Sequence, residues 1–304
     1  DLLIMRNLAG LLREKRVKEG SLDFDLSEPE LVYKEGTLYS VMSLARNEAH
    51  EVIEEFMLVA NEAVASYLIA KEVPLLFRIH PPPSQERLAK LREMLAHFDF
   101  SFPSRNRITS KGLQFLLRQA EGKPEQKFVM LQVLKSLKLA IYSDENEGHY
   151  GLAKKEYTHF TSPIRRYPDL VVHRILKATL ENRKIDTIPL SAVAQHCSEQ
   201  EREADEAERN LMEWRILRFL KSKLGEEFEG IIVGVSQAGV FVRLIDYFVD
   251  GVIPFSNFRE DYFFKKRTKM LIDKKTGKTF ELGDRMKVLL ASVDPLLRRI
   301  GLAL

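Results

Sequence analysis

The chain has 304 residues, of which 45% are hydrophobic and 30% are charged, with a net charge of +3. This length and composition can bury a sizeable core and predict about two domains, whereas so small a net charge does not by itself indicate a nucleic-acid partner. The single cysteine, Cys197, excludes an internal disulfide framework and a multi-cysteine zinc site, and fits a reducing cytoplasm. No apolar run reaches membrane-spanning length and nothing resembles a signal peptide, so we expect a cytoplasmic chain with no membrane contact. The start at Asp1 suggests a piece of a longer polypeptide.

The first 70 residues carry two helical patterns with a hairpin pattern between them. Residues 2–16 place apolar side chains at helical spacing, and Gly20 is expected to end that helix. Residues 31–33 and 37–41, separated by 34–36, predict a short β-hairpin. A long helix is expected from residue 47 to residue 70. Its predicted buried arc contains Val52, Ile53, Phe56, Met57, Val59, Ala60, Ala63, Val64 and Tyr67. Its predicted solvated face contains Glu51, Glu54, Glu55, Asn61 and Glu62.

The middle of the chain is predicted to be mainly helical. Helices are expected near residues 86–96, 109–121 and 125–142, followed by an acidic loop at 143–148. Ser162 and Pro163 predict an N-cap and a first-turn proline, so a helix is expected to begin there and run through Ile175. Residues 189–224 predict a long helix with a stripe whose small central residues, Ala204 and Ala207, imply close approach of another element.

The pattern changes from helical to alternating after Leu224 and Gly225. Five short strands, near residues 228–234, 240–244, 251–253, 286–290 and 300–302, predict a small closed barrel of the OB type. The predicted fold class is therefore α+β, with a largely helical part at residues 1–224 and a β-barrel at 225–304.

Residues 149–176, HYGLAKKEYTHFTSPIRRYPDLVVHRIL, resemble the signature of the RNase II / RNase R family of 3′-to-5′ exoribonucleases. The resemblance extends over the whole chain, and GVFVRL followed by DGVIPFSNF resembles an S1-type RNA-binding domain. It implies that residues 1–224 are the C-terminal part of an RNB catalytic domain and that residues 225–304 are an S1 domain. Single-stranded RNA would be degraded processively to nucleoside 5′-monophosphates.

This sequence departs from the family's pattern at the metal site. In the family, a cluster of aspartates N-terminal to the matched region binds two divalent metal ions. Asp23 with Asp25, and the isolated Asp144, do not resemble that cluster. We therefore expect the Mg²⁺ ligands outside this chain.

Arg165 matches the arginine of the family's SPIR motif, which contacts the scissile phosphate and stabilises charge in the transition state. A guanidinium suits this role because its planar fork can pair with two phosphate oxygens. Arg166 points about 100° away on a helix and is a second candidate for substrate binding. Asp169 is expected to orient Arg165 by an i,i+4 pair.

Two residues of the first 70 match family positions at the RNA 3′ end. Phe24 matches an aromatic ring that stacks on a base, although a core phenylalanine is an equally good interpretation. Glu55 matches a carboxylate that contacts the ribose, which would distinguish RNA from DNA. The solvated acidic face remains its alternative.

Tyr150 and Tyr157 are candidates for lining the RNA channel, with buried tyrosines whose hydroxyls are hydrogen-bonded as the alternative. His149, His159 and His173 show no metal-site spacing and are interpreted as packing or hydrogen-bonding residues.

In the barrel, Phe241 and Phe255 are candidates for stacking on RNA, with Val240 and Val242 expected on the face opposite Phe241. Pro254 stands where the family's barrel often has a histidine, which puts part of the usual binding surface in doubt. The loop from Lys265 to Lys278 contains Lys265, Lys266, Arg267, Lys269, Lys274, Lys275 and Lys278. It is either a solvated loop or a patch that tracks the RNA backbone.

The favoured hypothesis is the C-terminal part of an exoribonuclease that acts on single-stranded RNA and is a monomer when full length. The alternative is a non-catalytic RNA-binding protein or fragment of the same fold. A protein-interaction scaffold would leave Arg165, Phe24 and the lysine-rich loop without a role.

Overall fold

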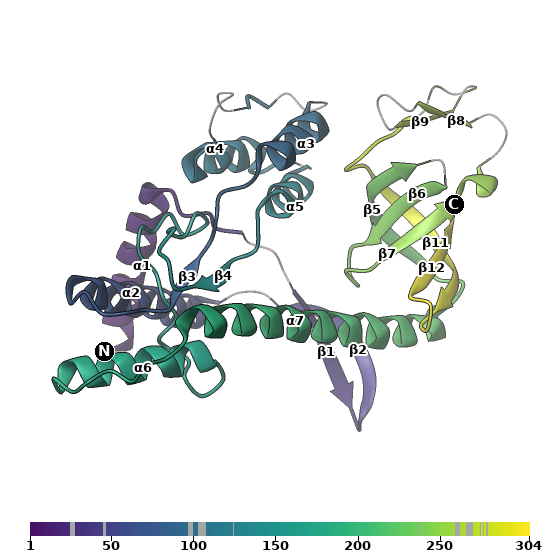
Figure 1. Cartoon of the computed structure of the whole chain (residues 1–304). Coiled ribbons are helices and arrows are strands. Elements are labelled where there is room, and N and C mark those ends of the chain that lie inside the picture. Colours follow the sequence, from purple (N-terminus) through teal and green to yellow (C-terminus); the bar gives the residue numbers. More distant parts are fainter. Residues whose placement is uncertain are drawn as a thin grey trace. The chain divides into compact units, whose positions relative to one another are not determined.

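The computed structural model describes residues 1–24, 28–44, 47–96, 100–102, 108–123, 125–236, 238–258, 262–265, 270–273, 275, 277 and 279–304. The chain forms two compact units: Asp1–Leu26 with Arg46–Ala204 (unit 1), and Ser27–Ala45 with Asp205–Leu304 (unit 2). Unit 1 is mainly helical and unit 2 contains the barrel, which confirms the α+β class (Figure 1). The predicted boundary at Leu224–Gly225 stays a prediction, since the two units divide inside a long helix.

Unit 1 begins with helix α1, Leu2–Glu19, and continues after the hairpin with α2, Glu48–Ala70. α1 ends where predicted, because Gly20 adopts the left-handed conformation with φ 114°. A Cβ at Gly20 would lie 2.8 Å from the Lys111 side chain, so no other residue fits there without a shift. The side chain of Asn47 caps α2 by accepting from the His50 backbone N–H at 3.0 Å.

The prediction of which face of α2 is buried is wrong. Glu55 and Asn61, predicted to be solvated, are 2% and 3% exposed, whereas Ile53, Val59 and Tyr67 are exposed. The reason lies across the interface with α1. There the Arg16 guanidinium, 5% exposed, donates to Glu55 from Nη2 at 2.6 Å and from Nε at 3.0 Å. A buried carboxylate is tolerated only with such a partner, and helical periodicity does not encode one.

A small sheet lies within the helices of unit 1. Strand β3, Phe77–Ile79, pairs with β4, Ile141–Ser143, in antiparallel fashion. Helices α3, Gln85–Leu95, α4, Ser110–Ala120, and α5, Gln126–Ser136, lie between them in sequence. The helix predicted for 125–142 therefore ends at Ser136, because the chain becomes extended at Leu137 to reach β4. β3 packs on buried residues of α2 and of the helix that follows β4: Ala65, Leu68, Val171, Val172 and Ile175.

That helix, α6, spans Tyr167–Leu180 and begins later than predicted. Residues 163–165 form a turn, and Arg166 is extended with φ −126° and ψ 118°. Pro168 then occupies the first turn of α6, the role predicted for Pro163. The Asp169 carboxylate accepts from the Ser162 backbone N–H at 2.8 Å and so holds the turn against the start of α6.

Helix α7, Leu190–Leu220, continues into the 3₁₀ turn η1, Lys221–Lys223. The prediction that Ala204 and Ala207 admit a neighbouring element is wrong, since both are exposed. The buried residues of α7 in unit 2 are instead Ile216, Leu217 and Leu220, which join the core of the barrel.

Unit 2 contains the predicted barrel and hairpin. The hairpin is β1, Glu28–Lys34, with β2, Thr37–Leu44. The closed barrel has the strand order β11-β12-β7-β6-β5. Its strands are β5, Glu227–Ser236; β6, Gly239–Leu244; β7, Asp250–Pro254; β11, Arg285–Asp294; and β12, Arg299–Ala303. These strands confirm the predicted OB-type barrel.

Short elements separate β7 from β11: the 3₁₀ turn η2, Phe255–Asn257, and a small sheet of β8, Tyr262–Lys265, β9, Met270–Asp273, and β10, Thr279–Phe280. Gly239 allows β6 to approach β7, because a Cβ there would lie 2.1 Å from the Ile253 carbonyl oxygen. No helix in the described ranges is long and apolar enough to cross a bilayer.

The Arg16–Glu55 pair predicts a large effect of charge removal on stability. Glu55→Gln removes the close carboxylate partner of buried Arg16 and leaves it only Asp23, which lies 3.9 Å from Nη2 and is already paired with Arg13. We therefore expect the free energy of unfolding to fall by about 3 kcal/mol. Urea denaturation followed by circular dichroism measures this. The matched control is Glu48→Gln on the same helix, whose carboxylate is 70% exposed and 3.5 Å from Arg6. It should change the value by less than about 1 kcal/mol. Equal effects of the two substitutions would contradict a stabilising role for the buried pair.

Candidate functional site

The turn at residues 162–166 presents one arginine and holds the next. Arg165 is exposed and forms no ion pair within the described part of the chain, and its neighbour Ile164 is fully exposed. Arg166 donates from Nη2 to Asp169 Oδ1 at 2.7 Å, and the Asp169 side chain is completely buried. Asp169 therefore orients Arg166, which corrects the predicted pairing with Arg165. The cause is the late start of α6, which leaves Arg165 in the turn and Arg166 at the N-cap. The turn leaves the Arg165 guanidinium available to an anion.

The segment just before this turn is fixed by a buried amide. Asn61 of α2 accepts from the backbone N–H groups of Phe160 and Thr161 at 2.9 and 3.2 Å. Its amide nitrogen donates to the Tyr157 hydroxyl at 2.9 Å. Helical periodicity predicts a solvated position for Asn61, and no local signal pairs it with residues about a hundred positions away.

The two candidate channel tyrosines are tied down by hydrogen bonds. Tyr157 is 5% exposed, and burial raises the pKa of its hydroxyl. The half-buried Tyr150 donates to the Ile108 carbonyl at 2.8 Å, and burial likewise raises its pKa. The packing interpretation is favoured for Tyr157, because the residue is buried and its hydroxyl accepts a hydrogen bond from Asn61. For Tyr150 a contact with RNA stays a prediction.

Histidines and tyrosines pack edge to face beneath the turn. The rings of His80 and His149 are 5.0 Å apart, those of His149 and Tyr157 are 5.4 Å apart, and those of Tyr157 and His159 are 5.9 Å apart. Burial, with the nearby charges of Arg166 and Arg78, lowers the pKa of His159 to about 2. Burial, with smaller effects of His80 and Arg78, lowers the pKa of His149 to about 3.

The ring contacts and hydrogen bonds of His149 and His159 confirm the packing and hydrogen-bonding role predicted for them, and their lowered pKa values keep both neutral near pH 7. The Nδ1 atom of His159 lies 2.9 Å from the Tyr142 hydroxyl. His173 stacks on Phe160, with ring centroids 4.1 Å apart, and its Nε2 lies 2.9 Å from the Phe160 carbonyl oxygen.

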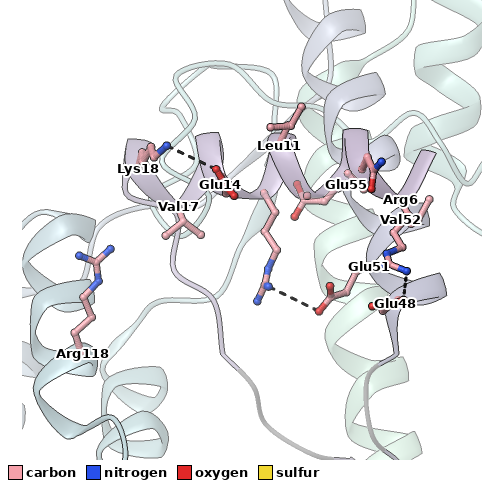
Figure 2. A pocket seen from close by; sticks show the side chains of 14 residues that line it. Arg6, Leu11, Glu14, Val17, Lys18, Glu48, Glu51, Val52, Glu55 and Arg118 are labelled. Carbon is pink, nitrogen blue, oxygen red and sulfur yellow. Dashed lines mark ion pairs between the residues drawn. The ribbon is translucent and has the colours of Figure 1, made fainter. Parts of the chain in front are cut away.

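A cavity of about 880 Å³ lies between α1 and α2, with Arg118 of α4 on its opposite side (Figure 2). Its lining mixes the cations Arg6, Arg13, Lys18 and Arg118 with the carboxylates Glu14, Glu48, Glu51 and Glu55. Several of these neutralise one another, as the Arg6–Glu48 and Lys18–Glu14 pairs in Figure 2 show. The cavity therefore has no strong preference for an anion.

The end of α1 fixes the segment that contains Phe24. Arg13 donates from Nη2 to Asp23 Oδ2 at 2.9 Å, and Arg16 donates from Nη1 to the Ser21 hydroxyl at 2.8 Å. The half-buried Phe24 follows directly, and stacking on a base stays a prediction for it.

Glu55 was predicted to contact a ribose, with a solvated face as the alternative. The alternative is wrong, because Glu55 is buried. The ribose contact stays a prediction, and it would compete with Arg16 for the carboxylate oxygens.

The barrel residues lie in unit 2. Phe241 is 37% exposed while Val240 and Val242 are fully buried, which confirms the predicted alternation along β6. Phe255 is half-buried against the barrel core, so less of its ring is open to a ligand. Lys265 ends β8, and Lys266 lies outside the described residues.

The described residues include no group of three or more histidine, cysteine, aspartate or glutamate side chains arranged to hold a metal ion. Within these ranges the donor set therefore does not fit a Mg²⁺ site.

Comparison with known proteins gives two family matches. The RNB domain model matches residues 1–182, and the S1 RNA binding domain model matches residues 221–304. The chain is 40% identical over 299 residues to the Ribonuclease R of Aquifex aeolicus, covering 96% of this chain and 42% of that protein. It is 35% identical to the Ribonuclease R of Escherichia coli, covering 99% of this chain and 39% of that one.

Solved structures of Mycoplasma genitalium RNase R have a similar fold. The apo form matches with a TM-score of 0.90 and 30% identity, over 100% of this chain and 49% of that chain. The form in complex with ribose methylated single-stranded RNA matches with a TM-score of 0.89, also at 30% identity and over the same shares. The chain thus spans half or less of the length of these relatives.

The lowered histidine pKa values predict a loss of stability in mild acid. Below about pH 6.5 the unfolded chain binds protons at His149 and His159, whereas the folded chain does not. The free energy of unfolding should therefore fall as the pH drops towards about 4, by up to about 1.4 kcal/mol per pH unit for each histidine. Urea denaturation at a series of pH values measures the slope. His149→Gln should reduce it, and the same change at exposed His50 should not; an unchanged slope in His149→Gln would refute this origin.

Proposed function

Because the chain belongs to the RNB domain family and ends in an S1 RNA binding domain, we propose that it is the C-terminal part of a 3′-to-5′ hydrolytic exoribonuclease. The whole enzyme degrades single-stranded RNA processively to nucleoside 5′-monophosphates. The observation that carries the proposal is the turn at 162–166, in which Arg165 is exposed and unpaired among the described residues while Asp169 holds Arg166. The similarity to Ribonuclease R over nearly the whole chain supports it.

Arg165 binds the terminal phosphodiester in this proposal. Its planar guanidinium pairs with two phosphate oxygens and stabilises the negative charge that grows during hydrolysis. Asp169 acts indirectly, because it fixes Arg166 and the Ser162 backbone and so sets where the turn presents Arg165. Phe24 stacks on a base near the 3′ end, which requires no particular RNA sequence.

Mg²⁺, when bound, would activate the attacking water and offset charge on the phosphate. We propose that its ligands lie outside this chain, which the donor set of the described residues supports. The full-length protein is proposed to be a cytoplasmic monomer without membrane contact.

An RNA-binding role without catalysis is the second candidate. It is favoured by the same lack of a metal-binding group among the described residues. The two candidates differ in whether an acidic cluster completes the site.

Arg165→Ala in the complete enzyme separates catalysis from binding. We expect turnover to fall about 100-fold or more, because the charge on the phosphate in the transition state loses its partner. RNA affinity should fall less than about ten-fold, since one of many phosphate contacts is lost. Single-turnover hydrolysis and filter binding measure the two quantities. Arg174→Ala, at an exposed arginine of α6, is the control and should change neither. Equal losses of turnover and affinity would assign Arg165 to binding alone.

An assay of the 304-residue chain alone tests whether the metal ligands lie within this chain or outside it. We expect it to retain labelled oligouridylate on a filter but to release no uridine 5′-monophosphate when Mg²⁺ is added, because it lacks the metal ligands. Magnesium-dependent hydrolysis by this chain would show that the ligands are within it. Failure to retain the RNA would count against the RNA-binding role of this part.

A further inference from the structure

Unit 2 contains a second cavity, of about 520 Å³, between the β1–β2 hairpin and the last turns of α7. Tyr33 and Leu38 line it from the hairpin, and Trp214, Arg215, Arg218 and Phe219 line it from α7. The hairpin is held beside α7 because its Leu31 and Val41 pack against the core that contains Ile216, Leu217 and Leu220. The cavity is therefore formed by elements of one compact unit.

The two arginines of this cavity lie over aromatic rings. Arg215 Cζ is 5.8 Å from the centroid of the Tyr33 ring, and Arg218 Cζ is 5.4 Å from that of Trp214. Such cation–π contacts orient a guanidinium while leaving its N–H edge open. Neither arginine forms an ion pair or a side-chain hydrogen bond within the described ranges. Arg16 and Arg166, by contrast, each form an ion pair with a carboxylate.

The cavity is cationic and aromatic, and no carboxylate lines it. Two unneutralised guanidinium groups disfavour a cationic ligand and favour an anion. Indole and phenol rings favour a ligand with a flat π-face, and aromatic stacking on nucleobases is indifferent to sequence. A ligand that combines a phosphate with an aromatic base meets both conditions. The volume also lies in the range of pockets that enclose ligands of this size.

We propose that this cavity binds a nucleotide of single-stranded RNA, with the base stacked on Trp214 or Tyr33 and the adjoining phosphate on Arg215 and Arg218. The proposal rests on the proposed ribonuclease function. It adds a contact formed by the hairpin and α7 to the one predicted on the barrel at Phe241. The RNA would then be held by unit 2 at two separate places, which increases the effective concentration of the strand at each.

Trp214 supplies a direct test, because it is the single tryptophan of the chain. We expect a short oligouridylate, added to the 304-residue chain, to quench the emission of Trp214 in a saturable manner. Replacing both Arg215 and Arg218 by glutamine should move the midpoint of the quench to concentrations at least about five-fold higher, because the phosphate contacts are lost. Tyr33→Ala, a change on the hairpin side, should weaken the quench by a similar factor through loss of stacking.

Arg209→Gln is the matched control, since Arg209 is an exposed arginine of α7 that does not line the cavity. It should shift the midpoint less than about two-fold. Filter retention of the same oligonucleotide is measured in parallel, and circular dichroism confirms that each variant is folded.

The outcomes separate this inference from the proposed function. If RNA is retained on the filter but Trp214 emission does not change, the inference is overturned and the RNA-binding role stands. The same result is expected if a protein segment, and not RNA, occupies the cavity. A quench that is unaltered by the double arginine substitution overturns it as well. If no RNA is retained, the proposed function fails and the inference fails with it.

Discussion

The buried ion pair between Arg16 and Glu55 is the contact on which the described part of unit 1 depends. It joins the end of α1 to the middle of α2, across 39 positions of sequence. Removing two charges from water is costly, and only the close, multiply hydrogen-bonded geometry offsets that cost. The same guanidinium binds Ser21, and Arg13 beside it binds Asp23, so the pair also fixes where the chain leaves α1. Phe24 directly follows this fixed segment, so its position depends on the same contacts.

A second group of polar contacts involves α2 further along its length, at Asn61. Asn61 holds the backbone of Phe160 and Thr161 and the hydroxyl of Tyr157, while Asp169 holds Ser162 and Arg166. Between these two anchors the chain forms the turn that exposes Arg165. A rigid turn matters for a phosphate ligand because a guanidinium that is already positioned loses less entropy on binding. The neutral histidines beneath it supply packing and hydrogen bonds without adding charge near the ligand.

Unit 2 contains two different surfaces that we propose to contact RNA. The barrel presents Phe241 from a strand whose neighbouring valines fill the core. The hairpin and α7 present arginines stacked on rings. Aromatic rings and guanidinium groups contact base faces and phosphates rather than base edges, so both surfaces fit the proposed binding of RNA of any sequence.

The sequence by itself determined the order and kind of most elements. Helical spacing located α1, α2 and α3, Gly20 located the end of α1, and alternation located the hairpin and the barrel strands. These features are local, because they depend on backbone conformation and on which residues repeat at 3.6 or 2 positions. The matched motif around residues 149–176 likewise indicated the family, and the family models agree with it.

Only the tertiary structure decided which faces are buried and which charged groups meet. Glu55 and Asn61 are polar, so helical periodicity predicts that both face solvent. Both are buried, because partners distant in sequence satisfy their polar groups. Because α6 begins later than predicted, Asp169 pairs with Arg166 and not with Arg165. Local signals do not fix a helix start to within a few residues when either of two prolines could occupy the first turn. The cavity beside Trp214 exists only because the hairpin, nearly two hundred residues earlier in the chain, packs on the end of α7. Such contacts depend on the three-dimensional path of the chain, which neither composition nor spacing records.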